Sequence, residues 1–349
     1  MSVAELSDFK TAEKILTVYP PILLSLGLAG NILSVVVLSQ ANNRKTSTGA
    51  LLIFLAVTDS LILINSVFVR WLEHLFEVDF RNSSTGTCKF HVFISYLLLQ
   101  LSPWILVLVT IERVFSVLYP HRVRDVFTRR RVLIVLLPLV LFLSGLNAHL
   151  IYGYRLIFNE PFQRLRCEAI PEHVNFMFKF WTWIDFAFAF AIPFCVLLSG
   201  NITVVLKLKS SHNFRKRSTI ISVNGSHSRG GSTCRQERTT SYFTVTAIIL
   251  NITFVILVSP FSIFAIGQPY WFPVDTMTPE RHAGLILTGT ILLMILYTNN
   301  AVNFALYILC GTKFRRDFMN LFCRSRRRRR SMSETFSSNR TVHLSTISL

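Results

Sequence analysis

The chain of 349 residues is 51% hydrophobic, contains only 15% charged residues and has a mean hydropathy of +0.48. This composition excludes an ordinary soluble domain and indicates a lipid bilayer as the main solvent. The net charge of +18 does not indicate a nucleic-acid-binding protein, because the basic residues fall between apolar runs instead of forming one basic face.

Seven apolar runs are long enough to cross a bilayer as helices, which takes about twenty residues each. They cover residues 15–39, 50–70, 89–118, 131–152, 177–206, 242–266 and 284–310. Charged residues precede the first run, and no small-residue cleavage site follows a short apolar core, so this run is predicted to be a span and not a signal peptide. The sequence therefore predicts an all-α membrane protein with a seven-transmembrane helix bundle over residues 15–310.

The basic residues predict how the chain is oriented in the membrane. Most of the 36 Lys and Arg residues lie in the first, third and fifth connections between runs, or after the seventh run. Because basic segments stay on the cytoplasmic side, we expect a multi-pass plasma-membrane protein with residues 1–14 extracellular and the C-terminus cytoplasmic. Asn82, in the triplet Asn82-Ser83-Ser84, is then a glycosylation acceptor in an outer loop.

Several spans contain isolated polar residues. The buried polar positions are Asn31 in the first span, Asp59 in the second, Ser102 in the third, and Asn299 and Asn303 in the seventh. A carboxylate at membrane depth stays ionised only beside a cation or several hydrogen-bond donors. The third span also ends in a charged pair, Glu112 and Arg113, which marks this end of the span as a functional position.

Together these residues resemble the motifs of rhodopsin-class (class A) G-protein-coupled receptors. The matching features are Asn31 in "GN", Asp59 in "LAVTD", Cys88 lying 25 residues before Arg113, "ERV" at the end of the third span, Pro193 in the fifth, Phe254 six residues before Pro260 in the sixth, and "NFALY" ending the seventh. The motifs are spaced over separate spans in the right order, which makes the signal specific. The resemblance covers roughly residues 15–323.

The resemblance implies an ion site in the middle of the bundle. In this family, the positions of Asp59, Ser102, Asn299 and Asn303 hold a sodium ion between the second, third and seventh spans. A hard cation prefers such carboxylate, hydroxyl and amide oxygens. The alternative is a water-filled polar cluster that only packs the helices. No other cofactor is expected.

The resemblance also implies a switch at the cytoplasmic end. Arg113 would engage a G protein when the sixth span swings outward, and Glu112 would pair with it at rest. The other positions assigned to the switch are Phe254, Pro260, Asn303 and Tyr307. The alternative, an arginine that only extends to the lipid headgroups, does not explain the adjacent carboxylate.

Two positions in the fifth and sixth spans depart from the family pattern. Asn201 replaces a Tyr in the fifth span, and Thr240 replaces a second acidic partner that many members have for Arg113. Asn201 and Asn251 each begin an Asn-Ile-Thr triplet inside an apolar span, where no glycan can be added.

Cys88 and Cys167 are the only two of the six cysteines that are predicted to lie outside the cell. They match the pair that the family joins from the top of the third span to the second outer loop. The resemblance therefore implies a disulfide that holds this loop as a lid over the ligand cavity.

The ligand class is narrowed by two positions in the spans. Amine receptors need an aspartate where this chain has Ser95, and opsins need a lysine where it has Tyr297. The segments "FWTWIDFAFAFAIPF" and "NNAVNFALY" resemble invertebrate neuropeptide receptors of the FMRFamide-receptor-like kind. A peptide with Arg near an amidated C-terminus would pair with acidic side chains and contact aromatic ones. The residues expected to bind it are Ser95, Tyr96, Asp185, Trp181, Glu73 and Tyr297.

The segment after the seventh span is predicted to lie on the membrane surface. Apolar residues recur at helical spacing from Phe314 to Phe322 among basic ones, which predicts an amphipathic eighth helix over residues 311–323. Cys323 is a lipidation candidate. Residues 324–349 lack a core-forming pattern and are expected to be a disordered cytoplasmic tail that recruits arrestin when phosphorylated.

The sequence thus predicts a receptor and not an enzyme, because paired catalytic groups are not evident in it. Its expected partners are an extracellular peptide, a heterotrimeric G protein, arrestin and membrane lipids. Two alternatives stay open at this point. One is a chemosensory receptor for a small molecule on the same fold; the other is a channel or transporter, although internal repeats, which favour a transporter, are not found in the sequence.

Overall fold

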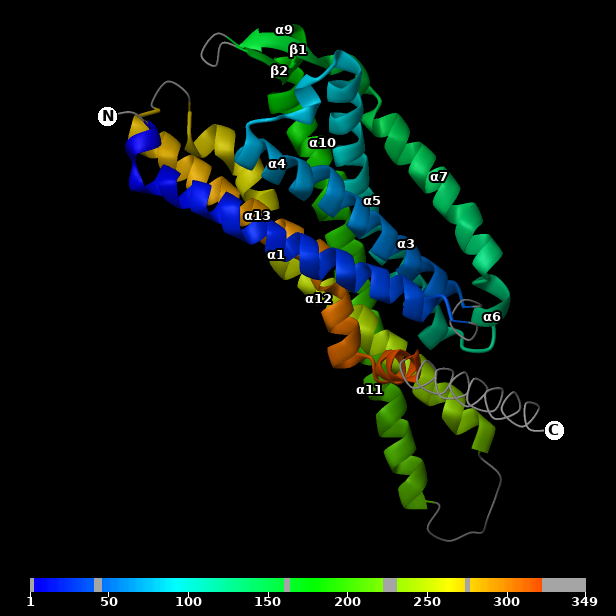
Figure 1. Ribbon diagram of the computed structural model, residues 1–349. Coiled ribbons are helices and arrows are strands. Elements are labelled where there is room, and N and C mark those ends of the chain that lie inside the picture. The colour runs from blue at the N-terminus through cyan, green and yellow to red at the C-terminus, as the bar shows by residue number, and fades with distance from the viewer. Residues whose placement is uncertain (1–2, 41–45, 160–163, 222–230, 274–276, 322–349) are drawn as a thin grey trace, which may run out of the picture.

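The computed structural model describes residues 3–40, 46–159, 164–221, 231–273 and 277–321. Within these ranges, seven helical segments are long and apolar enough to cross a membrane, which confirms the predicted spans. They cover Ser7–Leu38, Ser47–Phe76, Thr85–Leu118, Arg129–Gly153, Pro171–Ser210, Thr244–Trp271 and Pro279–Cys310. They pack side by side as one bundle (Figure 1). The predicted tail and Cys323 lie outside the described residues.

Four of the spans are built around one long helix each. These helices are α1 (Ser7–Leu38), α5 (Thr85–Leu118), α12 (Gly231–Trp271) and α13 (Pro279–Cys310). The second span consists of α3 (Ser47–Ile62), a π-helical turn η2 (Leu63–Phe68) and α4 (Val69–Phe76). The fourth span consists of α7 (Arg129–Asn147) and α8 (His149–Gly153).

The fifth span is the most irregular of the seven. It contains α9 (Pro171–Phe176), η5 (Met177–Trp181), α10 (Thr182–Phe186), η6 (Ala187–Ala191) and α11 (Ile192–Ile221), of which η5 and η6 are π-helical turns. A π-helical turn holds more residues than an α-helical turn, so it rotates the residues that follow it about the helix axis. The short element η1 (Val3–Glu5) precedes the first span, and η3 (Phe80–Asn82) and α6 (Val123–Val126) lie between spans.

Several helices begin at a hydroxyl side chain that caps their first turn. Thr46 accepts a hydrogen bond from the backbone N–H of Gly49, and Ser84 accepts one from Thr87. Thr128 caps α7 and Thr278 caps α13 in the same way. Each cap satisfies one of the backbone donors that a helix leaves free at its N-terminus, and so places the start of the span.

An antiparallel hairpin closes one end of the bundle. Its strands are β1 (Tyr154–Asn159) and β2 (Arg164–Ala169), with Tyr154 opposite Ala169 and Leu156 opposite Cys167. The hairpin and α9 lie at the top of Figure 1. We call this the hairpin end. The opposite end, where α5 finishes at Leu118 shortly after Glu112 and Arg113, is called the Arg113 end.

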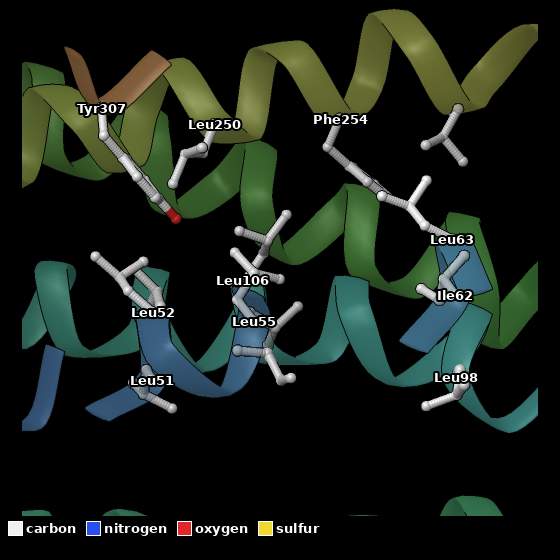
Figure 2. Packing of buried hydrophobic residues seen from close by; sticks show 14 of the residues in the cluster. Leu51, Leu52, Leu55, Ile62, Leu63, Leu98, Leu106, Leu250, Phe254 and Tyr307 are labelled. Carbon is white, nitrogen blue, oxygen red and sulfur yellow. The ribbon is translucent and has the colours of Figure 1, made fainter. Parts of the chain in front are cut away.

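The core is a layer of apolar side chains where the spans meet. In Figure 2, Leu52 and Leu106 lie across the core from Tyr307 and Leu250. The outer surface of the bundle is also apolar: Leu26, for example, is 68% exposed. An apolar core inside an apolar surface is what a bilayer requires, since lipid and not water surrounds the bundle.

Helix α1 packs closely along α13 because a glycine lies at their contact. A Cβ atom at Gly27 would lie 2.6 Å from Leu63 Cδ1 and 2.9 Å from Ala301 Cβ. We expect Gly27→Ala to lower the free energy of unfolding by about 1–3 kcal/mol through overpacking. The measurement is thermal unfolding of the purified protein in lipid nanodiscs.

Gly145 provides the matched control, because nothing lies within 4 Å of a Cβ placed there. Gly145→Ala should be neutral or should stabilise α7 by up to about 1 kcal/mol through helix propensity. Equal melting temperatures for the two variants would contradict a close contact at Gly27.

The chain turns back into a helix after α13. Residues 312–321 are helical, within the range expected for the amphipathic segment. Phe314 is buried in the main core, and its ring lies 5.2 Å from that of Tyr307 and 5.9 Å from that of Phe304. This short helix is therefore packed against α13 by its aromatic side.

Candidate functional site

A buried polar cluster surrounds Asp59 in the middle of the bundle. The carboxylate is fully buried and accepts three hydrogen bonds from neighbouring helices. Ser102 donates to its Oδ1 at 2.8 Å, Asn300 to the same oxygen at 2.7 Å, and Asn303 to Oδ2 at 2.6 Å. Asn31 of α1 joins the cluster by donating to the Asn300 carbonyl at 3.1 Å. Helices α1, α3, α5 and α13 thus meet around one anion.

The seventh span contributes a neighbour of Asp59 that was not predicted. Asn300, and not the predicted Asn299, donates to Asp59, although Asn299 is buried as well. As arranged, the Asp59 oxygens accept from the Ser102 hydroxyl and from the N–H groups of two amides, and an amide N–H group does not ligate a metal ion. A sodium ion here would require the amides of Asn300 and Asn303 to turn their oxygens inward.

The charged pair at the Arg113 end is buried and held by the start of α3. Arg113 Nη2 lies 3.1 Å from Glu112 Oε1, and the two residues are 6% and 2% exposed. Thr48 donates to the same carboxylate oxygen at 2.9 Å, Ser47 also donates to it, and Arg113 donates to Thr48. Sequence reasoning missed Ser47 and Thr48, because nothing in a helix-start "ST" pair indicates a long-range partner. A buried ion pair needs such added hydrogen bonds to offset its desolvation.

Of the other switch residues, Tyr307 and Phe254 belong to the apolar core, and Pro260 lies inside α12. Tyr307 is 2% exposed, and its hydroxyl, drawn in red in Figure 2, points into the apolar layer without a partner among the described residues. Phe254 is 1% exposed and its ring lies 6.1 Å from that of Phe190 on η6. Pro260 lies inside α12, where proline removes a helix hydrogen bond and allows a bend.

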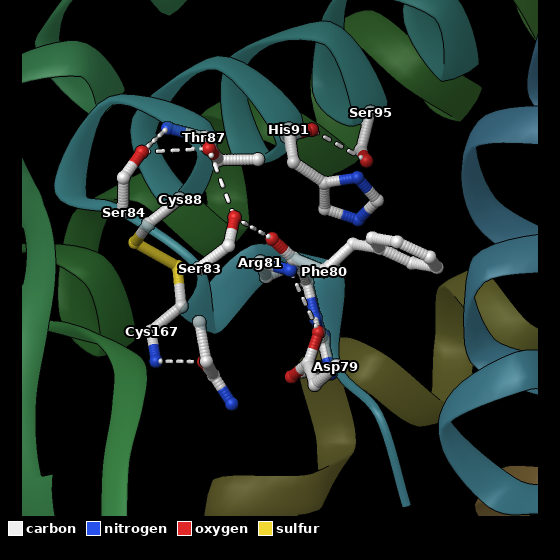
Figure 3. Close-up of a disulfide and its surroundings, with 11 residues drawn as sticks. Asp79, Phe80, Arg81, Ser83, Ser84, Thr87, Cys88, His91, Ser95 and Cys167 are labelled. Carbon is white, nitrogen blue, oxygen red and sulfur yellow. Dashed lines mark hydrogen bonds and ion pairs between the residues drawn. A yellow bond between two sulfur atoms is a disulfide. The ribbon is translucent and has the colours of Figure 1, made fainter. Parts of the chain in front are cut away.

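The predicted disulfide joins Cys88, in the first turn of α5, to Cys167 on β2 (Figure 3). It fastens the hairpin to the top of the third span. Asn82 strengthens this attachment, because its Oδ1 accepts a hydrogen bond from the Cys167 backbone N–H at 2.8 Å. Glycosylation of Asn82 stays a prediction; its Nδ2, the atom that would carry a glycan, is not used in this bond.

Three of the predicted ligand residues lie together near η5 and α10. The ring of Tyr96 meets that of Trp181 edge-on at 5.8 Å, and Trp181 is 2% exposed. Gln100 Nε2 donates to Asp185 Oδ1 at 2.9 Å, and Asn147 Nδ2 donates to Gln100 Oε1 at 2.7 Å. Gln100 and Asn147 are fully buried and were missed from the sequence. Asp185 is therefore joined to the buried interior, and its carboxylate is oriented by a chain of two amides.

The remaining predicted ligand residues belong to a second group. Ser95 accepts a hydrogen bond from Asn65 Nδ2 at 2.8 Å. Glu73 forms an ion pair with Arg81 of η3, so it does not present a free carboxylate. Tyr297 is 4% exposed and lies within electrostatic range of Arg81.

Arg81 is the centre of the charges on the loop before α5. Its Nε and Nη2 donate to the two carboxylate oxygens of Asp79, at 2.7 and 2.8 Å (Figure 3). Burial alone would raise the pKa of Asp79, but the hydrogen bonds and charge of Arg81 outweigh burial and hold the pKa of that carboxyl below its usual value. A bidentate pair of this kind gives the loop a fixed shape.

A hollow of about 760 Å³ opens at the hairpin end. It is lined by Phe9, Leu16, Arg70, Glu73, His74, Glu77 and Arg166. Its volume falls within the usual range for ligand sites. The lining carries two arginines as well as two glutamates. The hollow is therefore suited to a ligand that has both signs of charge.

The family follows from a match over most of the chain. Residues 30–307 match the model of the 7 transmembrane receptor (rhodopsin family). The chain belongs to this family of receptors. It is thus a multi-pass membrane protein, and a receptor instead of an enzyme, which confirms both predictions.

Individual relatives of this receptor are distant. It is 24% identical over 318 residues to a G-protein coupled receptor of Caenorhabditis elegans, in a match that covers 84% of the chain and 70% of the relative. It is 22% identical over 321 residues to the FMRFamide receptor of Drosophila melanogaster, covering 86% of the chain and 52% of that receptor. It is 25% identical over 311 residues to the human Neuropeptide S receptor, covering 86% and 76%.

Proposed function

We propose that this receptor binds a neuropeptide at its hairpin end and passes the signal to a heterotrimeric G protein at its Arg113 end. The proposal places the hairpin end outside the cell and the Arg113 end in the cytoplasm, as the distribution of Lys and Arg indicates. Two of the named relatives are receptors for peptides by their printed names.

The observation that carries the proposal is the chemistry of the hairpin end. A hollow lined by both signs of charge lies there, and the bundle also holds the oriented carboxylate of Asp185. A peptide with an arginine side chain and aromatic residues supplies partners for the carboxylate and for the rings of Tyr96 and Trp181. A small apolar ligand would leave these charged groups unused.

Signalling in this proposal is a population shift between two helix arrangements. Ligand that binds better to the open arrangement moves the equilibrium toward it. At the Arg113 end, opening releases Arg113 from Glu112 and Thr48. Sodium binding at Asp59, lipid anchoring through Cys323 and arrestin recruitment stay predictions.

The test is a screen of amidated peptides on cells that express the receptor, read by calcium or cyclic nucleotide. For an arginine-containing agonist, we expect Asp185→Asn to raise the half-maximal concentration at least about tenfold, because a charge-assisted hydrogen bond is lost. Glu172→Gln, which changes an exposed carboxylate on α9, should leave potency unchanged. Activation by volatile apolar compounds and by no peptide would overturn the peptide assignment.

A further inference from the structure

Helices α5, α11 and α12 are joined by a buried set of hydrogen bonds that the signalling proposal does not use. Asn251 of α12 donates from Nδ2 to Thr110 Oγ1 of α5 at 2.9 Å and to Asn201 Oδ1 of α11 at 2.9 Å. Asn251 is 1% exposed and Thr110 is 2% exposed. Asn201 and Asn251 are the two residues that begin Asn-Ile-Thr triplets inside apolar spans.

We propose that Asn251, Thr110 and Asn201 form a polar clasp that holds α12 against α5 and α11 and keeps the Arg113 end closed in the absence of agonist. This inference rests on the proposed function, because it assigns a regulatory role within the same helix movement. The clasp lies one helical turn from Arg113, since Thr110 precedes Arg113 by three residues on α5.

The hydrogen-bonding capacity of the three side chains explains why the clasp opposes separation. The Asn251 amide has two N–H groups, and each is used by a different helix. The Thr110 hydroxyl donates to the Leu106 carbonyl at 2.9 Å, so its lone pairs are left to accept from Asn251. Moving α12 away would leave these donors and acceptors unpaired in an apolar environment, which is unfavourable.

A glycine allows the three helices to come close enough for the clasp. A Cβ atom at Gly200, the residue before Asn201, would lie 2.4 Å from Thr110 Cγ2. Any larger residue would therefore push Thr110 away from the position in which it accepts from Asn251. The pair Gly200-Asn201 thus provides both the close approach and one of the acceptors.

The hydrogen bonds of the clasp can also be broken at a limited cost when the helices separate. Asn251 Oδ1 is buried and has no partner among the described residues. Water that enters when the helices part would satisfy this oxygen together with the freed N–H groups, and so recover part of the lost hydrogen bonding. The free energy of agonist binding then has to supply only the difference in free energy between the closed and the open arrangement.

The experiment compares Asn251→Leu, Thr110→Val and Asn201→Leu, which remove the hydrogen bonds at similar side-chain volume. We expect each to raise agonist-free nucleotide exchange on the G protein, about fivefold to tenfold for Asn251→Leu, which loses both bonds. The double variant Thr110→Val/Asn251→Leu should not exceed Asn251→Leu alone, because the two residues share one interaction. Thr203→Val is the control, since its hydroxyl donates to the Ser199 carbonyl within α11.

A second measurement separates failure of the clasp from failure of the signalling proposal. Spin labels at Val245 on α12 and Leu133 on α7, both exposed, report helix separation in the purified receptor without any G protein. A longer-distance population in Asn251→Leu than in the unsubstituted receptor supports the clasp, even if nucleotide exchange is never detected with any G protein. Unchanged label distances and unchanged basal exchange in all three variants would overturn it.

Gly200→Ala keeps the test valid if the leucine variants do not reach the membrane. It retains all three clasp side chains and displaces Thr110 through its new methyl group alone. We expect it to raise basal exchange and label distance in the same direction as Asn251→Leu. Behaviour identical to the unsubstituted receptor in both measurements would count against the clasp.

Discussion

Replacing Arg113 with alanine is expected to reduce agonist-driven G-protein activation at least about 100-fold while ligand affinity and delivery to the cell surface are retained. Arg113 lies 13 residues after Gln100 on α5, which is about 20 Å along the helix, so the site around Asp185 is unaffected. The fold should tolerate the loss, because Glu112 still accepts hydrogen bonds from Ser47 and Thr48. The measurement pairs ligand binding with nucleotide exchange on the same membranes.

Arg122→Ala is the matched control for this prediction. Arg122 is an exposed arginine on the segment that follows α5, where an arginine that only reaches the lipid headgroups would also lie. It should leave signalling close to that of the unsubstituted receptor. If signalling survives in Arg113→Ala, or falls equally in both variants, the assignment of Arg113 to G-protein activation is contradicted.

Loss of the disulfide between Cys88 and Cys167 should produce the largest loss of stability in the molecule. The bond spans 79 residues of sequence, and a cross-link of this length stabilises a folded protein by about 4 kcal/mol through the unfolded state. We therefore expect the double variant Cys88→Ser/Cys167→Ser to show much less receptor at the cell surface and a lower melting temperature. Ligand affinity should also fall, because the hairpin loses its attachment to α5.

Cys195→Ala serves as the control, since Cys195 is a free, exposed cysteine on α11. It should express and unfold like the unsubstituted receptor. If the double variant matched Cys195→Ala in surface level and melting temperature, the disulfide would not be the anchor of the hairpin.

The spans and the central polar cluster could be predicted from the sequence because they depend on length, polarity and order along the chain. Asp59 is the only acidic residue in the run of residues 50–70, and the family resemblance assigned Ser102 to the same cluster. The neighbour of Asp59 in the seventh span was harder to predict, because Asn299 was expected there and Asn300 makes the hydrogen bond. Neighbouring residues of a helix point about 100° apart, and the sequence does not set the rotation of one helix against another to that accuracy.

The ligand residues were less predictable for two physical reasons. The π-helical turns η5 and η6 rotate the residues around them, so the depth and direction of Asp185 do not follow from regular helix spacing. The partners of charged and polar residues also come from distant segments, as Arg81 does for Glu73 and Asn147 for Gln100. Such pairings appear only once the chain is folded.

Asn82 is a predicted glycan acceptor through its Nδ2 and a hydrogen-bond acceptor for the hairpin through its Oδ1. These two roles determine which substitution should be used to remove a carbohydrate from this receptor. A sugar on Nδ2 leaves Oδ1 free to accept from Cys167, but an Asn82→Gln receptor would lose the sugar and misplace the hairpin anchor together. Ser84 completes the acceptor triplet and also caps α5. Ser84→Asp eliminates the triplet and keeps a capping oxygen, so a sugar-free receptor with an undisturbed lid can be prepared by this route.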